Sequence, residues 1–171
     1  MGLDYTALLT KGIDGIISQI DEKLSSLDIT DIKNVESIEF YTALKAELEG
    51  VNALAENYRN EALRLYEATS EKEYLELAQV LENVPKKPAK TFREALQSVH
   101  FFTFNLCGLY SMGKVDDFLY PYYKSDIEKG ILTPEDAQEL VDCFVTYTDG
   151  VADEEVFADI EGDTSYIESY N

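Results

Sequence analysis

The chain has 171 residues, with 34 Asp and Glu against 14 Lys and Arg and a formal net charge of −20 at pH 7. Because like charges repel, this balance argues against binding to nucleic-acid phosphates or to an anionic membrane surface. Hydrophobic residues make up 45% of the chain, which is enough to bury a core at this length. A protein partner with a basic surface fits the charge, and a homo-oligomer is an open alternative.

The two cysteines, Cys107 and Cys143, follow no metal-ligand spacing, so we expect no metal site and no cofactor. Two cysteines without such a spacing suit a reducing compartment. The first residues show neither a basic start nor a small-residue cleavage site, and no run reaches the ~20 apolar residues that a membrane span needs. The sequence therefore predicts a cytoplasmic protein.

Apolar residues recur at helical spacing through the first third of the chain and predict two helices. The first covers about residues 5–27, and Gly12 and Gly15 should fray or kink its start. The second covers about residues 37–68. Gly50 in its middle indicates either a close helix crossing or only a loss of stability.

A capping box, Ser70-Glu-Lys-Glu73, predicts the start of a third helix that continues to Val84. Pro85-Lys-Lys-Pro88 should end this helix and hold the chain extended. The same four residues form the one basic spot in an otherwise acidic sequence.

A second capping box, Thr91-Phe-Arg-Glu94, opens a fourth helix. Beyond Gln97 this helix is apolar almost all round, which is typical of a central, buried helix. His100 lies on it and is interpreted as a core residue rather than as a general base. A pair with Cys107, two turns further on, is the weaker alternative.

A fifth helix is predicted over about residues 115–129, and Pro121 should bend or split it. Gly130 suits a left-handed helix end. Thr133 and the proline after it then open a sixth helix, over about residues 134–147. No strand-period run is present, so we predict an all-α, antiparallel multi-helix domain of about six helices with an acidic C-terminal tail.

The composition changes near the end of the chain, and we divide it into a helical domain, residues 1–145, and an acidic, Tyr-containing segment, residues 146–171. The segment holds eight acids and no Lys or Arg, but apolar residues are interspersed, so we expect it to dock on its own core or on a partner. The candidate partner-binding residues are Asp149, Asp153, Glu154, Glu155, Asp159, Glu161, Asp163, Tyr166, Glu168 and Tyr170.

Two ordered runs carry a family resemblance. The first is Val84-Pro85, Pro88 and Thr91-Phe-Arg-Glu-Ala-Leu-Gln97. The second runs from Gly113-Lys-Val-Asp116 through Pro121-Tyr-Tyr123 and Asp126 to Gly130 and Thr133-Pro-Glu-Asp-Ala-Gln-Glu-Leu-Val-Asp-Cys143. These runs resemble an internal helical segment of the glycyl radical enzymes, the superfamily of pyruvate formate-lyase and glycerol dehydratase. The resemblance covers most of this chain but only a modest slice of such an enzyme.

The resemblance implies a radical stored on a glycine of an Arg-Val-x-Gly-aromatic motif and relayed to a cysteine inside a ten-stranded barrel. This sequence has neither that motif nor strand content. Cys107 lacks the acid that follows the dehydratase cysteine by two residues, and Cys143 aligns with a helix position. Lys114 and Asp117 stand where the family has Arg and Gln. We therefore assign no catalytic and no cofactor-binding residue.

Two hypotheses follow. In the first, the chain is a non-catalytic acidic interaction protein derived from such a segment, which inhibits a basic protein by mimicking nucleic-acid charge. In the second, it is a subunit or fragment of a glycyl radical lyase or dehydratase, inactive alone, that associates with a barrel-containing partner through the apolar face around residues 101–123. Catalysis by this chain alone ranks behind both.

Overall fold

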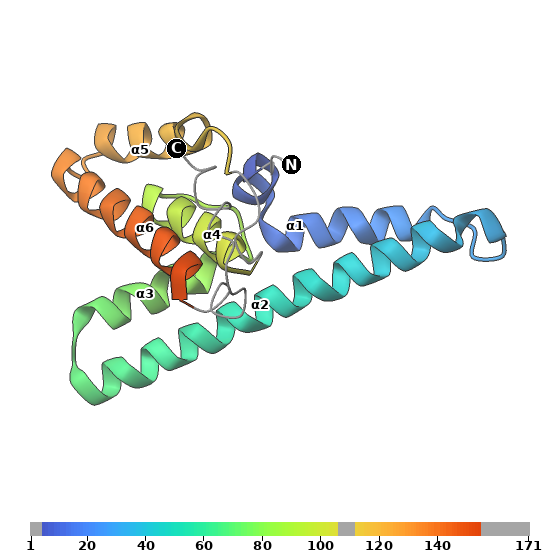
Figure 1. Cartoon of the computed structure of the whole chain (residues 1–171), viewed down its shortest axis with the longest axis horizontal. Helices are drawn as coiled ribbons and strands as arrows, with labels where there is room; N and C mark the ends of the chain where they lie inside the picture. Colours follow the sequence, from blue (N-terminus) through green and yellow to red (C-terminus); the bar gives the residue numbers. More distant parts are fainter. Residues whose placement is uncertain (1–4, 106–111, 155–171) are drawn as a thin grey trace, which may run out of the picture. The chain divides into compact units, whose positions relative to one another are not determined.

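The computed structural model describes residues 5–105 and 112–154, and within these ranges it contains helices and turns but no strand (Figure 1). The side chains of residues 104–105 and 148–154 are outside this description. Six α-helices and one short 3-10 helix cover the described ranges, which confirms the all-α prediction. The chain forms two compact units, one from Thr6 to Lys90 and the other from Thr91 onward together with Tyr5. None of the described helices is long and apolar enough to cross a membrane.

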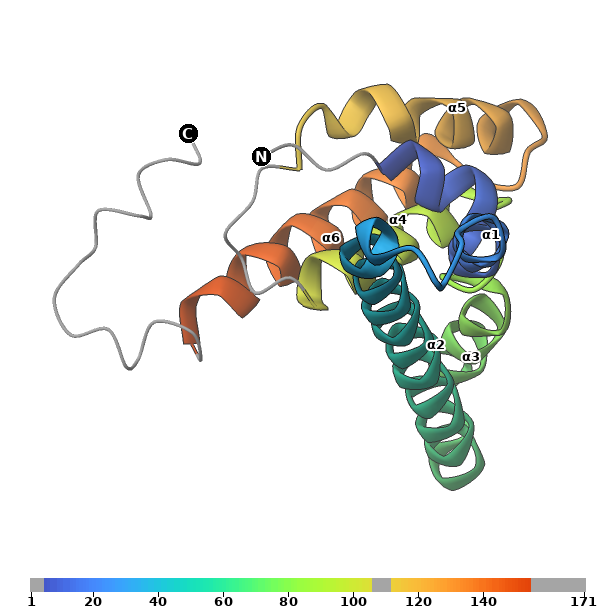
Figure 2. The same cartoon turned by 90° about the vertical axis from the view of Figure 1, so that its right-hand side faces the viewer.

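The unit from Thr6 to Lys90 is built on a helical hairpin. It comprises α1 (Tyr5–Ser25), η1 (Ile32–Asn34), α2 (Val35–Thr69) and α3 (Lys72–Asn83). Helices α2 and α3 lie side by side over the length of α3 (Figures 1 and 2). The residues that α2 buries lie seven apart and mark one narrow stripe, and they are Leu48, Ala55 and Ala62.

Gly50 does not mark a helix crossing. It is exposed, and a Cβ built on it would meet nothing within 4 Å. Its effect on α2 is therefore only the loss of stability that a mid-helix glycine causes. This outcome decides between the two interpretations that the sequence allowed.

The predicted capping box at Ser70 is wrong. Ser70 has a left-handed backbone (φ 60°) and ends α2, with its N–H donating to the carbonyl oxygen of Tyr66 at 2.8 Å. Glu71 is the extended residue before α3, and its N–H donates to Thr69 Oγ1 at 3.2 Å. The turn between α2 and α3 is so short that one residue has to reverse the chain, and Ser70 cannot do this and cap α3 as well.

Gly12 interrupts α1, as predicted. Its backbone (φ 67°, ψ 173°) is not helical, and the next N–H, that of Ile13, donates to the Pro85 carbonyl oxygen at 3.0 Å. A Cβ on Gly12 would lie 2.4 Å from the carbonyl carbon of Lys87, so only glycine fits here. The residues from Pro85 to Pro88 were predicted to be extended. They turn back instead, because their backbone hydrogen-bonds to α1. The Val84–Pro85 bond is cis.

The second unit contains α4 (Phe92–Asn105), α5 (Val115–Glu128) and α6 (Pro134–Glu154). Both α5 and α6 pack against α4, which agrees with the prediction of a central, buried helix there. The core of this unit is formed by Phe92, Ala95, Leu96, Val99, Leu119, Ala137 and Phe144. Helix α5 is continuous through Pro121, so this proline does not split it.

The helix boundaries of this unit follow local capping signals. Thr91 Oγ1 accepts from the N–H of Glu94 at 3.2 Å, and Glu94 Oε2 accepts from the N–H of Thr91 at 3.3 Å. At the start of α6, Thr133 Oγ1 accepts from the N–H of Asp136 at 3.1 Å. Gly130 ends α5 with a φ of 67°. All three capping predictions are confirmed, because each motif is satisfied within a few residues of itself.

Helix α6 continues past its predicted end to Glu154. Acidic residues do not break a helix, and each further residue adds one backbone hydrogen bond once the helix exists. The first part of the acidic segment is therefore helical. The division of the chain at residue 145 remains a prediction.

Candidate functional site

The second motif run forms α5 and places a buried carboxylate against the start of α4. Asp126 is 2% exposed, and its Oδ2 accepts a hydrogen bond from the backbone N–H of Phe92 at 2.7 Å. A negative charge at this helix end also interacts favourably with the helix dipole. Oδ1 of Asp126 is buried and has no partner among the described residues. Asp126 thus joins two segments that are 34 residues apart.

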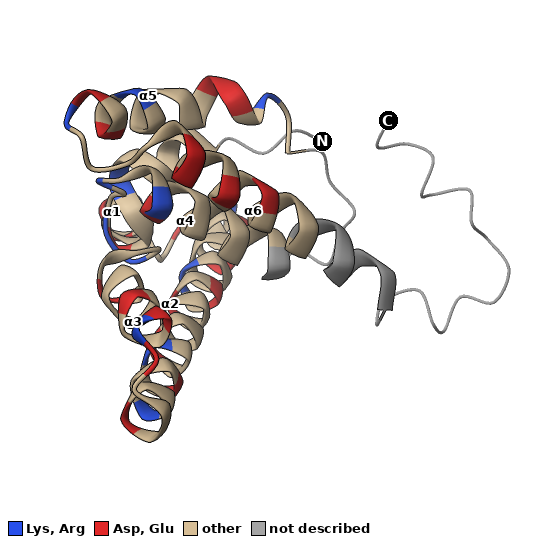
Figure 3. Cartoon of the chain, turned by 90° about the vertical axis from the view of Figure 1, so that its left-hand side faces the viewer, with Lys and Arg blue, Asp and Glu red and all other residues tan. Residues whose placement is uncertain are grey.

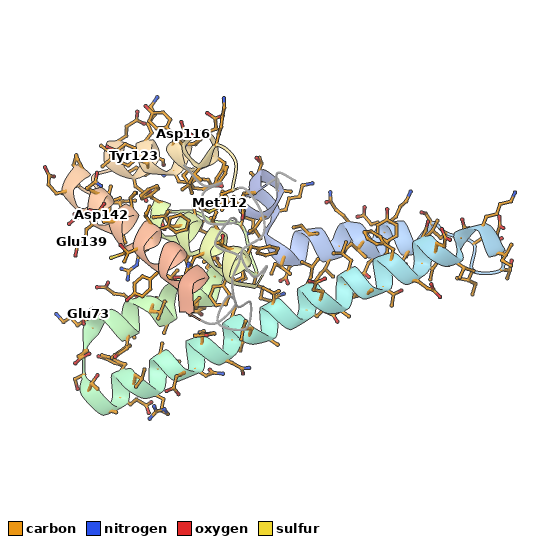
Figure 4. All side chains as sticks on the ribbon, viewed as in Figure 1. Glu73, Met112, Asp116, Tyr123, Glu139 and Asp142 are labelled. Carbon is orange, nitrogen blue, oxygen red and sulfur yellow. The ribbon has the colours of Figure 1, made fainter. Side chains whose placement is uncertain are left out.

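Aromatic rings pack around this capping contact. The rings of Phe92 and Tyr123 meet edge to face with centroids 5.8 Å apart, and Tyr120 lies 6.2 Å from Tyr123. Figure 4 shows Tyr123 on α5, the helix that the second motif run forms. Burial raises the pKa of the neighbouring Tyr122, so this phenol stays protonated at neutral pH. Tyr123 therefore contributes ring packing against Phe92 at this contact.

The start of α5 is held near the body of α4. Thr103 Oγ1 donates to the carbonyl oxygen of Val99 at 2.7 Å and lies 3.9 Å from the sulfur of Met112. Gly113 then turns the chain with a φ of 70°. Asp116 lies in the first turn of α5, where a carboxylate is favourable (Figure 4). The motif glycine and aspartate therefore direct the chain from this turn into α5.

The described residues that the sequence raised for acid–base chemistry or metal binding are His100 and Cys143. The ring of His100 lies 6.4 Å from that of Phe144, and burial lowers the pKa of His100, so its imidazole is neutral at pH 7. Cys143 is exposed. No group of three potential ligands occurs in the ranges that the structure covers. Cys107, the alternative partner of His100, lies outside those ranges.

The residues predicted to bind a partner are not brought together in the described structure. The backbone of Asp149, Asp153 and Glu154 belongs to α6, but their side chains are outside the description. The other seven also lie outside it, and they are Glu155, Asp159, Glu161, Asp163, Tyr166, Glu168 and Tyr170. These assignments stay predictions. Exposed acids that we did not assign from the sequence, Glu139 and Asp142, occupy the described part of α6 (Figure 4).

Sequence reasoning did not assign a role to Asp126. One signal was available, because Asp126 lies seven residues after Leu119 and therefore on the buried face of α5. A carboxylate on such a face needs a donor, and the free N–H groups at the start of α4 supply one. Chemically, this arrangement can fix helices relative to one another within the unit, but it offers no nucleophile.

The family follows from a comparison of the whole chain with family models. The model described as pyruvate formate lyase-like matches residues 1–157. The chain belongs to this family. The resemblance to glycyl radical enzymes inferred from the motifs is thereby confirmed.

Curated proteins are similar to this chain over most of its length. Isethionate sulfite-lyase of Bilophila wadsworthia (strain 3_1_6) is 32% identical over 152 residues, which are 82% of this chain and 18% of that enzyme. The 4-hydroxyphenylacetate decarboxylase glycyl radical subunit of Clostridioides difficile (strain CD196) is 31% identical over 156 residues, or 83% of this chain and 17% of that subunit.

Solved structures agree with this assignment. A structure from work on 1,2-propanediol dehydration in Roseburia inulinivorans matches with a TM-score of 0.79 and 31% identity, over 82% of this chain and 18% of the other. The glycerol-bound form of the B12-independent glycerol dehydratase from Clostridium butyricum matches with a TM-score of 0.77 and 27% identity, over 84% and 19%. The chain thus spans less than a fifth of the length of these relatives.

Proposed function

We propose that this chain is the helical scaffold segment of a glycyl radical lyase, decarboxylase or dehydratase. It has no activity until it associates with barrel-bearing sequence, in the same polypeptide or in another one. The main support is the family match, together with the small share of each relative that the chain covers. The chain's own contribution is positional, because Asp126 and the motif tyrosines hold α4 and α5 together.

The surface that we propose for this association lies where α1 leads into α2. Ile29 is 80% exposed, Ile32 is 85% exposed and Phe40 is 61% exposed. Large apolar side chains exposed so near one another in the sequence favour an interface, since burying them removes apolar area from water. In contrast, Phe101 and Leu119, from the face that the sequence suggested, are already buried within the chain. The proposed surface is therefore residues 29–40.

The test is affinity capture with the tagged full chain from a lysate of the source cells, prepared without oxygen. We expect retention of a polypeptide with the Arg-Val-x-Gly-aromatic motif, identified by mass spectrometry. The double variant Ile32→Asp/Phe40→Asp should retain about tenfold less, because it places charge in the apolar interface. Ile131→Asp is the matched control, since Ile131 is equally apolar and also exposed, but lies outside residues 29–40.

Two results would contradict association of this chain with a separate barrel-bearing polypeptide. One is capture of no polypeptide of this family by the wild-type chain. The other is equal retention by the double variant and the wild-type chain. Helical circular dichroism of each variant establishes that the loss comes from the surface and not from unfolding.

The second candidate function, charge mimicry towards a basic protein, is supported by the net charge of −20. Along α1 and α2, however, acids are interleaved with Lys and Arg (Figure 3), as in the pairs Lys45–Asp21 and Arg64–Glu61, whereas α6 carries acids without Lys or Arg. This candidate therefore depends on the acidic segment. Replacing Asp149, Asp153, Glu154 and Glu155 by Lys should abolish capture of a basic partner and its dependence on salt, and unchanged capture would refute it.

A further inference from the structure

A hollow of about 220 Å³ opens in the unit from Thr6 to Lys90, between α2, the end of α3 and the loop that follows α3. The polar residues that line it are Asn52, Glu56, Arg59, Glu82, Lys86 and Lys87. Half of these six residues are cationic, in a chain whose acids outnumber its bases 34 to 14. The hollow thus contains the basic spot that the sequence showed, with an arginine from α2 added to it.

The two lysines are held in place by their backbone. The N–H of Asp14 donates to the carbonyl oxygen of Lys86 at 2.9 Å, and the N–H of Lys87 donates to that of Asn83 at 2.7 Å. Gly12 makes the approach of α1 to this loop possible. No ion pair of Lys86 or Lys87 occurs among the described residues. Both ammonium groups are therefore available to an anion.

Two buried polar atoms of lining residues lack partners in the described structure. They are Nε of Arg59, a donor, and Oδ1 of Asn52, an acceptor. One other nitrogen of each side chain is engaged, because Arg59 Nη1 lies 3.2 Å from Glu56 Oε1 and Asn52 Nδ2 donates to Asp14 Oδ1 at 3.2 Å. Buried polar atoms are normally paired. A ligand that satisfied both would offer an acceptor to Arg59 and a donor to Asn52.

Charge and size narrow the class of ligand. Three cations and two carboxylates give the lining a formal charge of +1, so a monoanion neutralises it, whereas a doubly charged phosphate would bring in a second charge without a partner. The volume lies below the roughly 300 Å³ where pockets for drug-sized ligands begin, so the ligand has few atoms. We propose that this hollow binds a carboxylate with an adjacent hydrogen-bond donor. Either a free 2-hydroxy acid or an aspartate residue of a polypeptide, with its own N–H, supplies that chemistry.

The net charge of the chain does not prevent this binding. At 0.15 M ionic strength, charges further away than about 8 Å are largely screened, so the lining residues dominate. The expected affinity is in the millimolar range, since few contacts are made. Raising the salt concentration should weaken binding, because the contacts are between charges.

The test is titration of the ¹⁵N-labelled full chain with glycolate, followed through the amide signals of Arg59, Lys86 and Lys87. We expect saturation with a Kd of about 10 mM or below. Acetate, which lacks the hydroxyl donor for Asn52, should bind several-fold more weakly. Inorganic phosphate should bind more weakly than glycolate, because its second charge loses hydration and gains no partner in a lining of charge +1. A peptide with blocked termini and one aspartate distinguishes the two sources. Tighter binding of the peptide indicates a polypeptide ligand, and tighter binding of glycolate indicates a free 2-hydroxy acid.

Variants locate the site. Arg59→Gln and the double variant Lys86→Gln/Lys87→Gln should each weaken glycolate binding about tenfold, because each removes charge-assisted hydrogen bonds. The double variant Lys124→Gln/Lys129→Gln removes the same charge from α5 and its end, and should bind as the wild type does. The proposal is overturned if glycolate moves no lining amide, if phosphate binds as tightly as glycolate, or if the α5 variant weakens binding as much. Comparison of glycolate with acetate on the wild-type chain tests the proposal even if a variant fails to fold.

Discussion

Replacing Asp126 by Ala should destabilise the unit that contains α4, α5 and α6. The carboxylate is 2% exposed and accepts from the N–H of Phe92 at 2.7 Å, the short end of the range for such bonds. A hydrogen bond to a charged group contributes about 1.5–3 kcal/mol, and the loss of a helix N-cap costs about 0.5–2 kcal/mol. These figures describe the same contact and are not additive. We therefore expect a loss of about 2–3 kcal/mol in the free energy of unfolding.

The assay is urea denaturation of the full chain, with amide hydrogen exchange to localise the effect. The N–H of Phe92 should exchange faster in the variant, because it loses its acceptor. Asp116→Ala is the matched control, since Asp116 is an exposed acid at the start of the same α5 helix. Its replacement should cost about 0.5 kcal/mol or less. Equal losses for the two variants, or unchanged exchange of the Phe92 amide in the Asp126 variant, would refute the reasoning.

Further predictions concern Gly12 and Gly50, and the titration of Asp136 and His100. Gly12→Ala should cost more than about 1 kcal/mol by urea denaturation, because of its positive φ and the 2.4 Å approach of Lys87, whereas Gly50→Ala should stabilise by up to about 1 kcal/mol. Hydrogen bonds from Thr133 lower the pKa of Asp136. Stability from Asp136 should be present above the unfolded pKa and lost as the pH falls through the folded one, and Thr133→Ala should raise the Asp136 pKa measured by NMR. Burial lowers the pKa of His100, so stability should decline as the pH falls below about 6.5, and His100→Phe should remove that decline.

Local signals in the sequence predicted most helix boundaries of the second unit. The boxes at Thr91 and Thr133 and the left-handed end at Gly130 are each satisfied by atoms within a few residues. Such motifs depend little on the rest of the fold, which is why they could be read without it. The kink at Gly12 was predicted for the same reason, although the loop that packs against it was not.

The two wrong predictions have different causes. Ser70 matched a capping pattern, but the tight turn between α2 and α3 required a left-handed residue at that position. The residues after Val84 contain two prolines and suggested an extended segment, but hydrogen bonds to α1 turn them back. At Ser70 the short turn outweighed the capping pattern, and after Val84 hydrogen bonds to a distant segment outweighed the preference of proline for extended chain.

The sequence by itself determined the helical class, the main capping motifs and, through the ordered runs from Val84 to Cys143, the family. These properties depend on residue spacing and short-range hydrogen bonds, which a linear pattern contains. Only the tertiary structure decided that Asp126 caps a helix 34 residues earlier, that Arg59 and Lys86 line one hollow, and that Ile32 and Phe40 remain exposed. Each of these depends on which distant segments meet, and burial and long-range pairing are settled only when the chain packs.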